Sequence, residues 1–149
     1  MKKLLLFGSV FLVLLGLLAL PRASREEKAE AQFWADREAL EMLAREILER
    51  GSTEDVVLPD GWSDASLYRS GVHTVEFSLG SSGFASETAY WGVNYVPSDN
   101  SAFLGRFWGQ TWEYWKPQGD GRLYYEPEGD NTCYVKKLDE CWYYYELRF

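Results

Sequence analysis

The end of the chain alternates in character from one residue to the next. From residue 141 to residue 149, odd and even positions form two sets: Cys141, Tyr143, Tyr145, Leu147 and Phe149, against Trp142, Tyr144, Glu146 and Arg148. Successive side chains of a β-strand point to opposite faces, so this pattern predicts a strand with a core face and a partly polar face. We expect the aromatic residues of the second set to face outward.

The pattern between residues 22 and 51 is helical. Ser24 and Glu27 fit a capping box at a helix start, and Gly51 suits the position that follows the last helical turn. One apolar stripe contains Phe33, Leu40, Leu43, Ala44, Ile47 and Leu48. These spacings predict an amphipathic helix that ends near Arg50 and packs on a sheet. Residues 26–31 carry little apolar surface, and we expect a stalk there.

Beyond residue 67 the period changes to two, with turn-forming residues between short runs. We expect strands at residues 73–79, 88–96, 110–116, 122–126, 131–137 and 141–149. Residues 103–116 also fit helical spacing, but the aromatic bias and the two glycines, Gly105 and Gly109, favour a strand at residues 110–116. Short strands joined by turns are typical of an antiparallel meander. The predicted fold class is α+β: one long helix on an antiparallel sheet of about five to six strands, which resembles cystatin-like folds in outline.

The N-terminus carries a hydrophobic segment. Two lysines precede residues 4–20, an apolar run rich in Leu, which is the layout of an export signal or a membrane anchor. The absence of a good small-residue cleavage site favours an uncleaved anchor. We expect the domain to be extracytoplasmic, held on the membrane or secreted. The chain then divides into a signal or anchor, a helix, a connector and a sheet region, at residues 1–21, 22–51, 52–66 and 67–149.

Composition and motifs narrow the function classes. Of the 149 residues 46% are hydrophobic and 17% aromatic, enough for one folded domain. The net charge of −8 argues against nucleic-acid binding. His73 and Glu76 lack the further ligands that a metal site needs, and the acidic turns around Asp120 and Asp130 lack the spacing of a calcium loop. No phosphate loop or nucleophile elbow is present, and we expect no cofactor.

The aromatic residues are the best binding candidates. Core packing is the commoner use of such side chains, but an exposed aromatic patch marks an interaction surface. We expect Trp142, Tyr144 and Trp115 to bind a glycan or an envelope protein without catalysis. The alternative is a small envelope hydrolase with carboxylates on the concave side of the sheet, because a catalytic pair distant in sequence leaves no local motif.

Two hairpin registers decide the state of Cys133 and Cys141. A loop centred on Lys137 places the two cysteines opposite each other and permits a disulfide, which suits an exported chain. A turn at Asp139 separates them by ~13 Å along the strands, beyond the reach of a disulfide. The sequence leaves both registers open.

Two segments near the end of the chain carry a resemblance. Gly129-Asp130-Asn131-Thr132-Cys133-Tyr134, followed by Trp142-Tyr143-Tyr144-Tyr145-Glu146-Leu147, resembles the C-terminal ends of small bacterial proteins with an N-terminal apolar segment. The Trp91-Gly92 strand extends the likeness. The resemblance implies this architecture and no particular activity.

Overall fold

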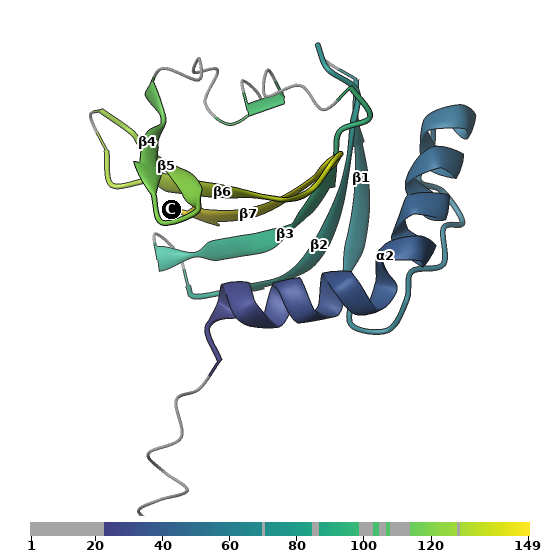
Figure 1. The fold of residues 1–149 in the computed structure, drawn as a ribbon, viewed down its shortest axis with the longest axis horizontal. Helices are drawn as coiled ribbons and strands as arrows, with labels where there is room; N and C mark the ends of the chain where they lie inside the picture. The colour runs from purple at the N-terminus through teal and green to yellow at the C-terminus, as the bar shows by residue number, and fades with distance from the viewer. Residues whose placement is uncertain are drawn as a thin grey trace, which may run out of the picture.

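A long helix packs on a seven-stranded antiparallel sheet in the computed structural model (Figure 1). The structure describes residues 23–69, 71–84, 87–98, 103–104, 107, 114–127 and 129–149. The elements are α2 (Arg25–Arg50), β1 (Asp64–Tyr68), β2 (Thr74–Ser82), β3 (Ala89–Tyr95), β4 (Lys116–Gln118), β5 (Gly121–Tyr125), β6 (Thr132–Asp139) and β7 (Trp142–Arg148). The α+β class is confirmed, with seven strands instead of five to six.

The predicted membrane segment, residues 4–20, lies outside the described residues. Within the ranges that the structure describes, no helix is both long and apolar enough to cross a membrane.

The last strand of the chain occupies the centre of the sheet. The strand order is β1-β2-β3-β7-β6-β5-β4, so β7 pairs with β3 on one side and with β6 on the other. All pairings are antiparallel, as the short turns predict. The two halves of the sheet therefore meet on β7.

Two strand predictions need correction. The expected connector, residues 52–66, contains the start of β1, which pairs Asp64 with Ser78 and Tyr68 with Thr74. As an edge strand, β1 buries too little to show a strong apolar pattern. The strand expected at residues 110–116 shares only Lys116 with β4. Residues 110–113 lie outside the described residues, and Tyr114 and Trp115 are not in a strand.

The ends of α2 follow the sequence signals. The Glu27 backbone N–H donates to Ser24 Oγ at 3.1 Å, and the Ser24 N–H donates to Glu27 Oε2 at 2.6 Å. Gly51 closes the helix in the left-handed conformation, with a φ of 67°, and its N–H donates to the Ile47 carbonyl at 2.8 Å. The capping box and the glycine stop are both confirmed.

The first turns of α2 do not form a stalk. Ala29 is 2% exposed, Arg25 binds Glu146 on β7, and Glu26 and Glu30 bind Lys136 on β6. The stalk prediction is wrong because these turns dock through ion pairs instead of an apolar stripe. The whole helix therefore lies on the sheet.

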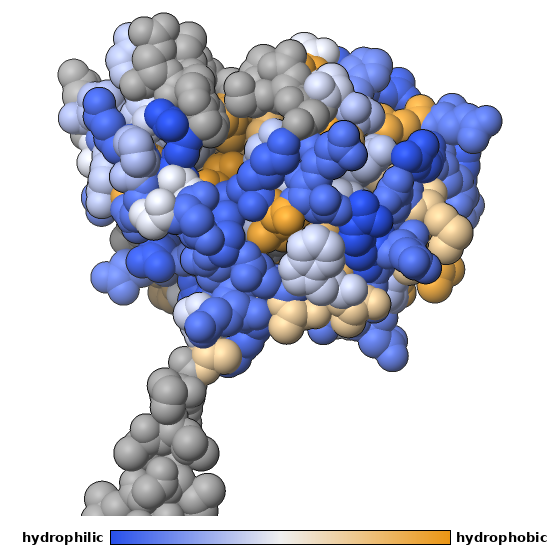
Figure 2. All heavy atoms as spheres, viewed as in Figure 1, coloured by the Kyte–Doolittle hydropathy of each residue, from blue (hydrophilic) through white to orange (hydrophobic). Residues whose placement is uncertain are grey.

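The sheet has a separate hydrophobic core on each face. The helix core contains Phe33, Leu40, Ala44, Ile47, Trp62, Val75, Phe77, Val93, Tyr95 and Trp142. The inner core, on the opposite face, contains Val96, Phe103, Leu104, Phe107, Trp115, Tyr124, Cys133, Val135, Tyr143 and Tyr145. Hydrophilic residues cover most of the side shown in Figure 2, with apolar residues visible between them near the middle.

Burial on both faces corrects the expected exposure of the aromatic residues. Trp142 is 1% exposed, Tyr144 is 0% exposed and Trp115 is 1% exposed. The alternation along β7 is as predicted, but α2 covers the face that was expected to meet solvent. An outward aromatic surface made of these three residues is therefore absent.

The cysteines are too far apart for a bridge. Asp139 pairs with Trp142, so the β6–β7 turn consists of Glu140 and Cys141, while Cys133 pairs with Leu147. Leu147 lies six positions after Cys141 in the chain, which corresponds to roughly 20 Å of extended strand. Both cysteines are thiols. The turn at Asp139 is the register that forms, and the alternative register, which would permit a disulfide, does not.

We expect Leu40→Ala to lower the free energy of unfolding by about 2–5 kcal/mol, because Leu40 is fully buried in the helix core. Urea unfolding of the full chain in detergent, followed by tryptophan fluorescence, measures this change. Met42→Ala, on the same helix at 68% exposure, is the matched control and should stay within about 0.5 kcal/mol. Equal effects for both variants would contradict the packing of α2 described above.

We also expect two thiols per chain when protein purified without reductant is unfolded and titrated. The register of β6 and β7 holds the two sulfur atoms apart in the folded state. A mass two hydrogens lower, with no titratable thiol, would show a bridge and a different hairpin.

Candidate functional site

A polar cleft lies where α2 begins and leaves part of the sheet uncovered. It consists of two cavities of about 590 and 640 Å³, which share Glu26, Glu146 and Arg148 in their walls. We call the first the arginine pocket, after Arg25 and Arg148 in its wall. Besides the shared Glu26 and Glu146, it is also lined by Ser24, Ser82, Glu87, Thr88 and Phe149. We call the second the tyrosine pocket, lined also by Tyr125, Tyr134, Gln118, Asp120, Asp130 and Thr132.

Strand register places the lining residues in rows across the sheet. Tyr125 on β5 pairs with Thr132 on β6, which pairs with Arg148 on β7. The next row joins Leu123, Tyr134 and Glu146 in the same way. These rows belong to the helix face, since Glu146 alternates along β7 with Tyr145 of the inner core. The floor of the cleft is therefore the part of that face that lies beyond the first turn of α2.

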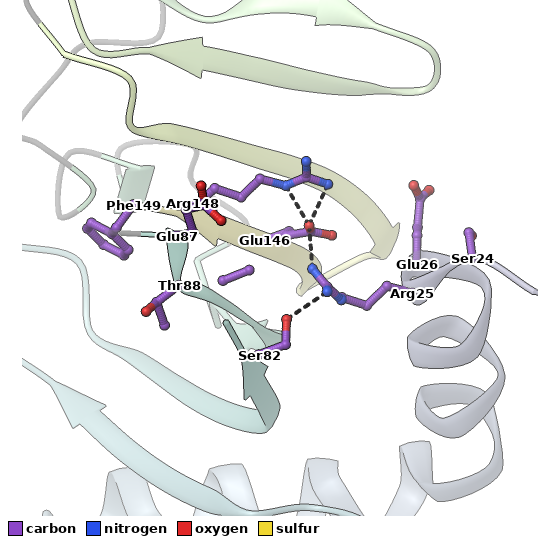
Figure 3. A pocket seen from close by; sticks show the side chains of 10 residues that line it. Ser24, Arg25, Glu26, Ser82, Glu87, Thr88, Glu146, Arg148 and Phe149 are labelled. Atoms are coloured by element: carbon purple, nitrogen blue, oxygen red, sulfur yellow. Dashed lines mark hydrogen bonds and ion pairs between the residues drawn. The ribbon is translucent and has the colours of Figure 1, made fainter. Parts of the chain in front are cut away.

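Glu146 is the buried charge at the centre of the cleft (Figure 3). It is 8% exposed, and its Oε1 accepts from Arg25 Nη1 at 2.9 Å and from Arg148 Nε at 2.8 Å. Arg148 Nη2 forms an ion pair with the same oxygen at 2.8 Å. Tyr144 donates its hydroxyl to Oε2 at 3.0 Å. Burial raises the pKa of Tyr144, as does the neighbouring Glu146. The phenol thus remains a hydrogen-bond donor, and both oxygens of the buried carboxylate are satisfied.

Arg25 is held on three sides. Its Nη2 donates to Ser82 Oγ at 2.8 Å, and its guanidinium carbon lies 4.3 Å from the ring centre of Trp91. Together with the Glu146 pair, these contacts fix the guanidinium at the mouth of the arginine pocket, where Figure 3 shows it between α2 and the strands.

Lys136 joins the two walls of the tyrosine pocket. Its Nζ lies 3.0 Å from Glu26 and 2.5 Å from Glu30 on α2, and 2.8 Å from Asp120 in the β4–β5 turn. Burial works to lower the pKa of Lys136, but the hydrogen bonds to the three carboxylates outweigh it and raise this pKa. The hydrogen bond from Lys136 lowers the pKa of Asp120. Lys136 stays charged and ties the turn to the helix.

Tyr134 is the second phenol at this place. Burial, followed by the nearby charges of Glu26 and Asp120, raises the pKa of Tyr134 to about 12. Tyr134 therefore keeps its proton at neutral pH, and its hydroxyl donates to Asp120 Oδ1 at 3.4 Å.

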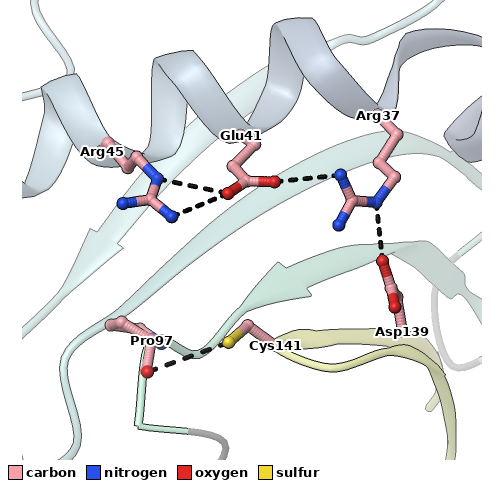
Figure 4. Close-up of polar contacts among 6 residues, drawn as sticks. All are labelled: Arg37, Glu41, Arg45, Pro97, Asp139 and Cys141. Carbon is pink, nitrogen blue, oxygen red and sulfur yellow. Dashed lines mark hydrogen bonds and ion pairs between the residues drawn. The ribbon is translucent and has the colours of Figure 1, made fainter.

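A second polar cluster fastens the middle of α2 (Figure 4). Arg37 Nε donates to Asp139 Oδ2 at 2.6 Å, and its Nη1 donates to Glu41 Oε2 at 3.0 Å. Glu41 also accepts from Arg45 Nη2 at 2.8 Å. The backbone N–H of Glu140 and the Arg37 side chain lower the pKa of Asp139. Each charge has an opposite partner, so this cluster attaches the helix to the end of β6.

The structure separates the three residues expected to bind a ligand. Trp142 belongs to the helix core, whereas Trp115 belongs to the inner core and packs against Tyr124 at 5.6 Å between ring centres. Of the three only Tyr144 contacts the cleft, through its bond to Glu146. Sequence reasoning missed Arg25, Lys136 and Tyr125, whose relation to one another depends on strand register.

No family model, curated protein or solved structure matches the chain. The cleft itself is therefore the basis for an inference about function.

We expect Lys136→Met to lower the free energy of unfolding by about 1–3 kcal/mol, between the values for exposed and buried ion pairs. The change leaves Glu26, Glu30 and Asp120 close together without a cation. Urea unfolding at pH 7 measures the loss, and Lys28→Met on the exposed side of α2 is the matched control.

The same pair of proteins tests the pH dependence. Because the pKa of Asp120 is lowered on folding, its bond to Lys136 contributes fully above the usual value of 3.8 and is lost as pH falls through the lowered pKa. The stability difference between the wild type and Lys136→Met should therefore narrow below about pH 4. A difference that stays constant from pH 7 to pH 3 would contradict the role of Asp120.

Proposed function

We propose that the chain is a non-enzymatic binding domain that takes a glycan into the tyrosine pocket. The observation that carries this proposal is the combination at that pocket of an aromatic ring, exposed at 62% in Tyr125, with carboxylate, amide and hydroxyl side chains. The ligand class, a carbohydrate bound by aromatic stacking, is the one expected from the sequence. The proposed site differs, because it is the cleft and not a surface made of Trp142, Tyr144 and Trp115.

Tyr125 supplies the stacking surface. The flat face of an aromatic ring packs against the C–H face of a sugar ring, and the tyrosine hydroxyl remains in water. Tyr125 stands at the end of β5 and pairs with Thr132, so its backbone is fixed in the sheet. A tyrosine side chain has few rotatable bonds, so on a fixed backbone it loses little freedom when a ligand binds.

The polar lining suits the hydroxyl groups of a sugar. Asp120 and Asp130 accept hydrogen bonds, and Gln118 both donates and accepts them. Lys136 holds Asp120 at 2.8 Å, so this carboxylate is oriented before a ligand arrives. Pre-oriented acceptors beside an aromatic ring favour a polyhydroxylated ligand over an apolar one.

The hydrolase alternative receives less support. A glycoside hydrolase needs one carboxylic acid whose pKa is raised enough to donate a proton. Lys136 has the opposite effect on Asp120, whose pKa is lowered, and it also binds Glu26 and Glu30. Asp120 therefore remains an ionised acceptor, which fits binding without turnover.

The location of the domain is part of the proposal. Residues 4–20 would anchor the chain in a bacterial envelope or direct its export, with the domain on the extracytoplasmic side. Ser24, the helix cap, lines the arginine pocket and lies four residues after Leu20. Four extended residues reach at most ~14 Å, so an anchored domain would hold its cleft close to the membrane. A glycan of the envelope is then the ligand within reach.

We expect Tyr125→Ala to weaken saccharide binding about tenfold, the effect of losing ~1.4 kcal/mol of stacking. The measurement uses full-length protein in detergent on a panel of immobilised neutral and acidic saccharides. Tyr114→Ala, at 58% exposure and away from both pockets, is the matched control and should bind as the wild type does.

Two outcomes would contradict this proposal. Absence of binding to any saccharide would reject a glycan ligand, and equal binding by Tyr125→Ala would reject the tyrosine pocket as its site. Release of new reducing ends from a bound oligosaccharide would favour the hydrolase.

A further inference from the structure

Three exposed aromatic side chains lie at one end of the sheet. Phe84 in the β2–β3 connection is 90% exposed, Tyr90 at the start of β3 is 45% exposed, and Phe149, which follows β7, is 40% exposed. The rings of Tyr90 and Phe149 pack edge to face, with 6.0 Å between their centres. We call these three residues the aromatic rim. A group of exposed apolar side chains marks an interaction surface.

Backbone hydrogen bonds hold the aromatic rim in place. The Phe149 N–H donates to the Thr88 carbonyl at 2.9 Å, and the Glu87 N–H donates to the Phe84 carbonyl at 3.2 Å. Thr88 precedes β3 and Phe149 follows β7, so the first of these bonds extends the pairing of the two strands. The rim residues are therefore positioned by the backbone of the sheet and of the turn before β3.

The aromatic rim lies at the end of the sheet where α2 begins. Phe149 and Ser24, the helix cap, line the same cavity, the arginine pocket. Arg25 donates to Ser82 at 2.8 Å, and Figure 1 shows the end of β2 beside the first turn of α2. Ser24 follows the apolar run of residues 4–20 by four residues, which reach at most ~14 Å. A membrane that holds this run would therefore lie within reach of the rim.

The chemistry of this end of the sheet favours apolar contact with lipid. The wall of the arginine pocket has two arginines against three glutamates, so it offers no excess of positive charge to anionic headgroups. Aromatic rings, in contrast, are stable at the level of the headgroups, where the ring contacts apolar chains and a tyrosine hydroxyl stays in water. The rim supplies such rings beside the point where the apolar run joins the domain.

We propose that the aromatic rim inserts into the headgroup region of the membrane and forms a second attachment beside residues 4–20. The inference rests on the membrane location proposed above and does not depend on the glycan ligand. A single anchor would leave the domain free to turn on the short segment that joins it to the bilayer. A second contact fixes its orientation, with the rim against lipid. Tyr68, which pairs with Thr74 at the opposite end of the sheet, then faces water.

Fluorescence quenching in vesicles tests this inference on the full-length chain. The protein is reconstituted into phosphatidylcholine vesicles with and without bromine on the acyl chains near the headgroups, and the fluorescence of the wild type is subtracted. Tyr90→Trp adds a reporter at the rim, and Tyr68→Trp adds one at the opposite end with similar exposure, 39% against 45%. Brominated lipid should remove most of the fluorescence added at position 90 and little of that added at position 68.

A further substitution tests whether the rim makes the contact. Phe84→Ser, introduced into Tyr90→Trp, should reduce the quenching, whereas Val57→Ser, at a position 84% exposed in the connector, should leave it unchanged. Added salt should have no effect, because the contact is apolar and the lipid carries no net charge. Phe84→Trp, at 90% exposure, repeats the main measurement if Tyr90→Trp does not fold.

Three results would overturn the aromatic rim as a membrane contact. These are equal quenching at positions 90 and 68, quenching that Phe84→Ser leaves unchanged, and quenching that salt abolishes. Flotation of the vesicles after an alkaline wash separates this failure from failure of the membrane location. Protein that floats with the vesicles but shows no quenching at position 90 rejects the rim alone, whereas protein that does not float rejects the anchor itself.

Discussion

The arrangement of the cleft depends on ion pairs of both polarities between α2 and the sheet. Arg25 of the helix pairs with Glu146 of β7, and Glu26 and Glu30 of the helix pair with Lys136 of β6. Glu146 is buried, and a buried charge is tolerated only when it is paired, so its contact with Arg25 helps to fix where the helix begins on the sheet. Apolar packing takes over from Phe33 onward. The helix therefore does not cover the whole of this face of the sheet. The part of β5, β6 and β7 that it leaves uncovered is the floor of the polar cleft.

The sequence predicted those features of the fold that arise from contacts close along the chain. The limits of α2 follow from Ser24, Glu27 and Gly51, whose side chains or backbone act within one helical turn. The alternation along β7 was equally visible. The prediction that one face of β7 is exposed was wrong. A period of two shows that a strand has two distinct faces, but it does not show whether other elements cover one face or both. Here α2 covers one face, and Phe103, Leu104 and Phe107 pack on the other.

The candidate site was harder to predict for a related reason. Asp120 appeared as a turn residue, and it does stand in the β4–β5 turn, but its partner Lys136 lies on another strand. Arg25 belongs to a helix start whose composition indicated a stalk, and its partners Ser82 and Glu146 are 57 and 121 residues away. Such pairs leave no local spacing to recognise. The one signal available in the sequence was Glu146, which follows two tyrosines and precedes Arg148 in an otherwise aromatic strand. A charge in such a strand requires a partner if it is buried.

The position of β7 has a consequence for how the domain folds. β7 follows the other six strands in the sequence, yet it joins β3 to β6 and contributes Trp142 to one core and Tyr143 and Tyr145 to the other. Without β7, the strands that precede it lack their central partner and much of their buried surface. Loss of this one strand would therefore separate the two halves of the sheet and expose both cores at once.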